Sequence, residues 1–123
     1  MQIKLRATDR IFTKIVRIIF KYTCQKCGRE YRPDEPLGNL GVSHYYGRAR
    51  ENTRYDISNV SLLCNFPCHR SWEGEERLEY KEYMIKRLGQ EGFDILTLKA
   101  HTYHKRDDKM TLIILKAWLK ELS

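Results

Sequence analysis

The sequence predicts a small α+β protein in which helices flank an irregular, turn-rich centre. Its 123 residues are the size of one domain, and hydrophobic residues (41%) and charged residues (32%) stand in the balance of a folded, soluble chain. Turn residues interrupt the middle of the chain, whereas helical spacing of apolar residues marks both ends. We therefore expect one domain over 1–123, with a basic helical extension (1–23), a central part (24–75) and a helical C-terminal part (76–123).

The first predicted helix covers residues 9–22. Apolar residues recur there at helical spacing, and basic residues occupy the opposite side. The apolar set is Ile11, Ile15, Ile18 and Ile19, and the basic set is Arg10, Lys14, Arg17 and Lys21. Thr8 is suited to cap the start of this helix.

The centre, roughly residues 23–65, is short of helix signals. Pro33, Pro36 and Gly38 interrupt it. Two stretches are candidates for strands, Leu40–Tyr46 and Val60–Leu63.

Helical spacing returns after Phe66. It predicts a helix that runs from Leu78 to Leu88 and stops at Gly89, followed by a short helix around 93–98. A last helix is predicted over 110–122. Its buried side would be formed by Leu112, Leu115, Trp118 and Leu119.

The net charge of +7 is concentrated near the start of the chain, where residues 1–32 hold nine Lys and Arg against Asp9 and Glu30. Such a basic lobe suits a polyanion, most often a nucleic acid, although a solvated helix face has the same composition. The longest apolar runs are far below the roughly 20 residues of a membrane span, and no apolar signal core follows the basic start. We expect a cytoplasmic protein with no membrane partner.

Four cysteines form two close pairs, Cys24-x-x-Cys27 and Cys64-x-x-x-Cys68, with 36 residues between the pairs. Two close pairs joined by a long loop are typical of a tetrahedral structural zinc site, because each short turn supplies one edge of the tetrahedron. Two disulfides are the alternative, but no secretion signal supports them. A redox Cys-x-x-Cys would leave the second pair unexplained.

His44, Asn59 and His69 surround the second cysteine pair, within the order Ser43-His44-Tyr45, Asn59-Val60 and Cys64-x-x-x-Cys68-His69. On these residues, from Cys24 to about Gly89, the chain resembles the HNH endonucleases, whose ββα-metal core is a hairpin followed by a helix. Within that family it looks most like the phage NinG recombination nucleases.

The resemblance implies a metal-dependent endonuclease that hydrolyses DNA and leaves 5′-phosphate and 3′-hydroxyl ends. It implies that His44 is the general base, that Asn59 fixes the hairpin loop, and that His69 ligates a catalytic divalent cation, Mg²⁺ or Mn²⁺. It also suggests a phage or mobile-element origin, and thus the host-cell cytoplasm. A neutral imidazole suits activation of water, and a divalent ion suits stabilisation of charge on phosphate.

Ser43 departs from the family pattern, because many members carry Asp or His there as a metal ligand. Four explanations remain open. The metal shell is completed by water and phosphate; another carboxylate reaches in, Asp56 being the nearest in sequence; His44 itself binds metal; or the catalytic site is degraded. His69 as a zinc ligand in place of one cysteine is a further alternative.

DNA contacts are expected from two groups of basic residues. Near the site they are Arg54, Arg48 and Arg70, with Arg54 preferred because the resemblance to the NinG nucleases includes it. On the first helix they are Lys14, Arg17 and Lys21, which would contact the backbone of duplex or branched DNA without reading its sequence. The pair His101-x-x-His104 lacks acidic or cysteine partners at suitable spacing, so we expect exposed polar residues there.

Two other functions fit parts of the sequence. A non-catalytic zinc-ribbon nucleic-acid-binding protein would need the basic lobe and the cysteines but not His44, Asn59 and His69. A partner-docking protein would use the helix 110–122. The sequence leaves the oligomeric state and the choice between nicking and double-strand cleavage open.

Overall fold

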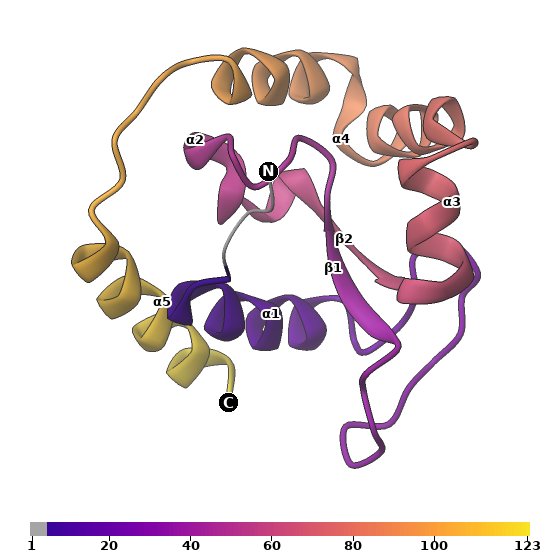
Figure 1. Cartoon of the computed structure of the whole chain (residues 1–123), viewed down its shortest axis with the longest axis horizontal. Coiled ribbons are helices and arrows are strands. Elements are labelled where there is room, and N and C mark those ends of the chain that lie inside the picture. The colour runs from indigo at the N-terminus through magenta and orange to yellow at the C-terminus, as the bar shows by residue number, and fades with distance from the viewer. Residues whose placement is uncertain (1–4) are drawn as a thin grey trace.

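A two-stranded antiparallel hairpin lies at the centre of the structure, a computed structural model that describes residues 5–123 (Figure 1). Strand β1 (Leu40–His44) pairs with β2 (Val60–Cys64), so that Leu40 lies opposite Cys64 and His44 lies opposite Val60. All five residues of β2 are buried. The two strands thus lie within the stretches that the sequence indicated, with β1 ending at His44 and not at Tyr46.

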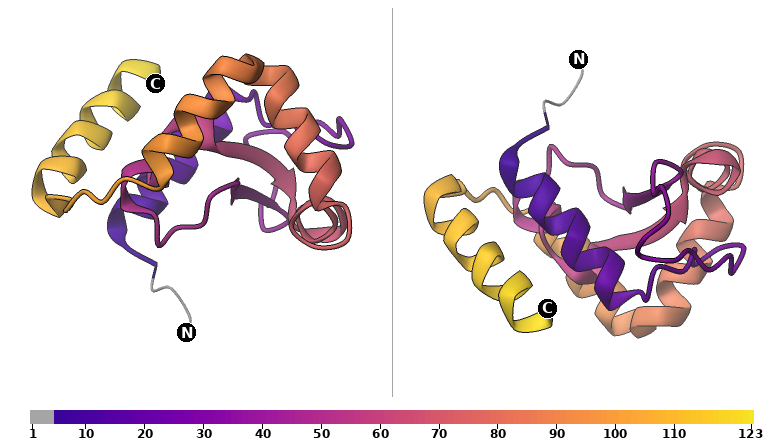
Figure 2. Two further views of the ribbon diagram at one scale, coloured as in Figure 1. Left: turned by 90° about the horizontal axis from the view of Figure 1, so that it is seen from above. Right: turned by 90° about the horizontal axis from the view of Figure 1, so that it is seen from below.

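Helices cover both faces of this hairpin. Helix α1 (Ala7–Ile19) lies against one face, and α4 (Arg77–Ala100) crosses the other, as Figure 2 shows. Because side chains alternate along a strand, His44 faces α1 and packs beside Phe12, whereas Ser43 faces α4 and contacts Tyr80. Helix α5 (Asp108–Leu122) packs alongside α1. The α+β class is therefore confirmed.

Helix α1 begins earlier than predicted, and Thr8 is not its cap. Arg6 is the N-cap, and its backbone N–H donates to the carboxylate of Asp9 at 2.7 Å. The helix ends at Ile19. Lys21 already has a positive φ of 54°, so the predicted extension to residue 22 is wrong.

Short helical turns fill the segments on either side of β2. Between the strands lie α2 (Glu51–Arg54) and the 3₁₀ turn η1 (Ile57–Asn59). After β2 come the π turn η2 (Asn65–His69) and α3 (Arg70–Glu73). No helix signal in the sequence predicted α2 or η1.

The C-terminal helices follow the predicted pattern. Gly89 breaks α4 into two segments, because its φ of +78° is left-handed and suits glycine. Asp107 caps α5 by accepting from the backbone N–H of Met110 at 3.1 Å. Leu115 is buried, while Leu112, Trp118 and Leu119 are half-buried. None of the helices within residues 5–123 combines the length and the apolar character that crossing a bilayer requires.

Candidate metal centre and hydrolytic site

The four cysteines come together at one end of the hairpin. Their sulfur atoms all lie within 4.8 Å of one another, and Cys27 Sγ is 3.7 Å from Cys64 Sγ. Neighbouring sulfurs of a tetrahedral zinc site with Zn–S bonds of about 2.3 Å are about 3.8 Å apart. No disulfide joins the four thiols. This donor set fits one metal ion, and a four-thiolate set is one of those typical of structural zinc.

The first cysteine pair sits on a tight turn directly after α1. The backbone N–H of Gly28 donates to the Cys24 carbonyl at 2.9 Å, and Gly28 has a φ of +79°, which suits glycine. The backbone N–H of Gln25 donates to Leu62 O at 2.8 Å, which ties this turn to β2. These backbone bonds join the turn to the hairpin.

The electrostatics of the cluster favour a cation. Burial would raise the pKa of Cys24, but backbone N–H groups of Cys27, Cys64 and Lys26 donate to its sulfur and lower that pKa to about 7. Burial, together with the neighbouring thiols, raises the pKa of Cys68. Four ionised sulfurs at this spacing, three of them on buried cysteines, would repel one another, and a divalent ion would remove that repulsion.

His44 lies at the end of β1 with one ring nitrogen already bonded. Its Nε2 is 2.9 Å from the backbone carbonyl oxygen of Arg54. Because a carbonyl only accepts, Nε2 carries the proton of the neutral ring, and Nδ1 is left as the basic nitrogen. Burial is the main reason that the pKa of His44 falls to about 4, with the nearby Arg48 cation adding to it. The imidazole is therefore neutral at physiological pH.

His44 and His69 line the same surface hollow of about 330 Å³, although they come from different elements. Other residues that line it are Asn65, Arg48, Gly41 and Asp9. The hollow opens along β1 and is bounded on one side by α1. The structure thus brings together two of the three residues that the resemblance assigned to catalysis.

Asn59 lies behind His44, fully buried, and closes the loop that follows β1. Its Oδ1 accepts from the Tyr46 backbone N–H at 2.9 Å, and its Nδ2 donates to the carbonyls of Tyr46 and Thr53 at 2.9 and 3.1 Å. These bonds use both ends of the amide. Asn59 holds the backbone around His44 and does not line the hollow.

Two residues that the sequence analysis did not select stand beside His69. Asn65 Oδ1 lies 3.4 Å from His69 Nδ1, and Glu73 Oε2 lies 2.6 Å from His69 Nε2. Their spacing, four residues before and four residues after His69, is the signal that would have found them. Burial would raise the pKa of Glu73, but its bonds with His69 and Ser43 hold that pKa below its usual value, so Glu73 is ionised.

The carboxylate proposed from sequence order, Asp56, is occupied elsewhere. Its Oδ2 lies 2.7 Å from Lys99 Nζ, and its Oδ1 accepts from the Ser58 backbone N–H at 2.9 Å. It does not line the hollow with His44 and His69.

Arg54 is a buried structural residue. Its side chain is only 1% exposed, and its guanidinium donates to Asp9 at 2.6 and 3.0 Å and to the Arg48 carbonyl at 3.2 Å. Arg54 was the arginine preferred as a DNA contact, but this burial and pairing give its side chain a structural role and leave almost none of it accessible to a phosphate. Sequence order does not reveal this pair, because Asp9 lies on α1, far from Arg54 in the chain.

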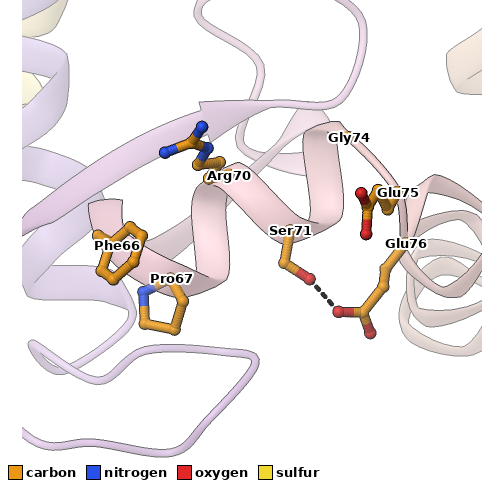
Figure 3. Close-up of a pocket in the computed structure, with 7 residues that line it drawn as sticks. All are labelled: Phe66, Pro67, Arg70, Ser71, Gly74, Glu75 and Glu76. Carbon is orange, nitrogen blue, oxygen red and sulfur yellow. Dashed lines mark hydrogen bonds between the residues drawn. The ribbon is translucent and has the colours of Figure 1, made fainter.

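The other arginines near the site are placed differently from one another. Arg48 lines the hollow with His44 and His69. Arg70 lines a separate hollow of about 360 Å³, which it shares with Phe66, Glu75 and Glu76 (Figure 3). Because two acidic residues line that second hollow, it is poorly suited to a phosphate group.

The basic residues of α1 are not equivalent. Lys14 is exposed on the helix, and Lys21 is exposed just after it. Arg17 is half-buried and donates to the carbonyls of Leu37 and Leu40 at 3.2 and 2.8 Å. Arg17 therefore anchors α1 to the start of β1, which leaves the two lysines as the exposed members of the predicted set.

The histidines near the end of α4 are exposed, as predicted. Within residues 5–123, the four cysteines form the only group of three or more His, Cys, Asp or Glu side chains that could share a metal ion. Comparisons of the chain with family models, curated proteins and solved structures found no match.

Proposed function

We propose that this protein is a metal-dependent endonuclease of the HNH type that hydrolyses DNA phosphodiester bonds. The observation that carries the proposal is the shared hollow of His44 and His69. A base and a metal-binding imidazole that face one hollow, beside Arg48, are the groups that phosphodiester hydrolysis needs.

In this proposal Nδ1 of His44 takes a proton from the attacking water, because Nε2 is held by the Arg54 carbonyl. Arg48 contacts the phosphate, and the hydroxide attacks phosphorus as the bond to the 3′ oxygen breaks, which leaves 5′-phosphate and 3′-hydroxyl ends. A divalent cation, Mg²⁺ or Mn²⁺, would be held by His69 and would neutralise charge on the phosphate and the leaving oxygen. Asn59 keeps His44 aimed at the hollow.

The cysteine cluster lies outside the hollow and holds in place the segment that carries His69. We assign zinc to Cys24, Cys27, Cys64 and Cys68, because the spacing of their sulfurs matches a tetrahedral S₄ set. Cys64 ends β2 and Cys68 directly precedes His69, so an ion held there fixes the segment that carries His69. Lys14 and Lys21 provide contacts to the DNA backbone.

A plasmid assay tests the proposal. Zinc-loaded wild type should relax supercoiled plasmid with Mg²⁺ or Mn²⁺ and not without them, and His44→Ala should lose this activity. His101→Ala is the matched control, because His101 is an exposed histidine outside the hollow. If wild type shifts the plasmid on a gel without cutting it under any metal condition, the non-catalytic nucleic-acid-binding function replaces this one.

A further inference from the structure

We propose that Glu73 is the carboxylate ligand of the divalent cation that His69 holds, so the site takes its acidic ligand from α3 and not from β1. This inference rests on the proposed nuclease function and identifies a residue that completes its metal site.

The first observation is the pairing of Glu73 with His69. Glu73 Oε2 lies 2.6 Å from His69 Nε2, with the two residues one helical turn apart. Adjacent ligands of an octahedral ion with bonds of about 2.1 Å are about 3 Å apart. The two atoms are therefore close enough for both to bind one ion, once the carboxylate swings aside and the ion takes the place of the proton between them.

The second observation is the contact between Glu73 and Ser43. Ser43 is fully buried, and its Oγ donates to Glu73 Oε1 at 3.3 Å while accepting from the Tyr80 hydroxyl at 3.0 Å. A strand residue as small as serine leaves room for a carboxylate to approach from α3. Glu73 thus brings a negative charge to the point on β1 where Ser43 itself has none.

Neighbouring carboxylates are committed to other partners. Asp9 accepts from Arg54, Tyr55 and the backbone of Arg6, and Asp56 pairs with Lys99. Among the acidic side chains of residues 5–123, Glu73 is the one whose carboxylate lies within hydrogen-bond distance of His69. A site for Mg²⁺ or Mn²⁺ needs oxygen ligands, and Glu73 supplies one beside Nε2 of His69.

The test is a titration of zinc-loaded protein with Mn²⁺ in the absence of DNA. The electron paramagnetic resonance signal of free Mn²⁺ measures how much of the ion is bound. Glu73→Gln and Glu73→Ala should each weaken binding by about tenfold or more. Glu75→Gln should bind as wild type does, because Glu75 is an exposed acid two residues away that lines the other hollow. Zinc content and circular dichroism establish that each variant is folded. His69→Ala removes the other proposed ligand of the pair and should weaken Mn²⁺ binding to a similar extent.

Glutamine at position 73 still accepts a hydrogen bond from His69 but carries no negative charge. If Glu73 only orients the imidazole, Glu73→Gln should bind Mn²⁺ as wild type does; if Glu73 is a ligand, both variants should lose affinity. Mn²⁺ binding by Glu73→Gln at wild-type affinity would overturn the proposal, and so would a wild type that binds no Mn²⁺. If Mn²⁺ binding depends on Glu73 but wild type cuts no DNA, the metal site stands and the nuclease function fails. If wild type cuts DNA and Glu73→Gln binds Mn²⁺ normally, the nuclease function stands and Glu73 is not a ligand of the metal.

Discussion

The carboxylate of Asp9 and the guanidinium of Arg54 form a buried ion pair that joins helix α1 to the segment between the two strands. Arg54 Nη2 lies 2.6 Å from Asp9 Oδ2, and the side chains are 1% and 6% exposed. The Tyr55 hydroxyl donates to the other oxygen of Asp9 at 2.9 Å. Since the Arg54 carbonyl holds Nε2 of His44, this pair fixes both the helix and the imidazole.

Removing one partner of this pair should destabilise the fold strongly. Arg54→Ala leaves the Asp9 carboxylate buried without its cation, and we expect a loss of about 3–5 kcal/mol in the free energy of unfolding. Urea unfolding of the zinc-loaded protein measures it. Arg50→Ala, at an exposed neighbour, should change stability by less than about 0.5 kcal/mol. Equal stabilities for the two variants would contradict the structural role of Arg54.

The pH dependence of stability should reveal the buried imidazole of His44. Burial lowers its folded pKa to about 4, below the unfolded value of about 6.5. Between these values the unfolded chain binds a proton that the folded chain does not. His44 therefore makes stability fall as the pH drops from about 6.5 to 4, by up to about 1.4 kcal/mol per pH unit.

Titration of the ring by NMR measures the pKa directly, and His44→Gln should remove this part of the pH dependence whereas His101→Gln should not. A His44 titration near pH 6.5 would show that the ring is solvated and that the expected slope is absent.

Asn59→Asp tests the loop closure behind His44. Aspartate keeps the shape and the acceptor but cannot donate, which leaves the Tyr46 and Thr53 carbonyls without the amide and buries a charge. We expect a loss of about 1–3 kcal/mol or more in unfolding free energy. Asn52→Asp is a control outside this loop closure, since its amide bonds on the surface to Lys99 and Thr102 carbonyls. Equal losses of unfolding free energy in the two variants would contradict a special role of Asn59 in closing this loop.

Metal removal should unfold the cysteine turns. Purified protein should contain one zinc ion per chain by elemental analysis, and cobalt substitution should give the absorption of a tetrahedral thiolate site. Strong chelators should release the ion, expose four thiols and lower the melting temperature, because metal binding is coupled to folding. Cys27→Ala should behave as chelated wild type does. Protein that keeps its melting temperature after complete metal removal would contradict a structural role for the ion.

The salt dependence of DNA binding should identify the exposed lysines. Lys14→Gln removes one phosphate contact and should reduce the slope of log K against log salt by about 0.9, without changing sequence preference. Lys116→Gln, on the exposed side of α5, should leave the slope unchanged. A reduced slope in the second variant but not in the first would place the DNA on α5.

Much of the fold could be predicted because its signals are local. Two stretches of the turn-rich centre were recognised as strand candidates, Gly89 marked the break in α4, and the spacing of the cysteines anticipated their cluster. The buried ion pair of Arg54 could not be predicted, because arginine is usually exposed and its partner lies on another element.

The candidate site was predictable in part for the same reason. His44 and His69 follow a recognisable order, and the structure places them in one hollow. Glu73 carries a local signal, its spacing of four residues from His69, but its contact with Ser43 depends on how α3 packs against β1. Only the tertiary arrangement distinguishes Glu73 from Asp56.

The pairing of Leu40 with Cys64 gives the cysteine cluster a second consequence. Side chains alternate along a strand, so a slip of one residue in the hairpin would turn Cys64 away from Cys24 and Cys27. A chain that has captured an ion with all four thiolates has already aligned its strands correctly. The same alignment places His44 on the face of the hollow. Binding of the ion by all four thiolates therefore also favours the strand register in which the imidazole points toward the hollow.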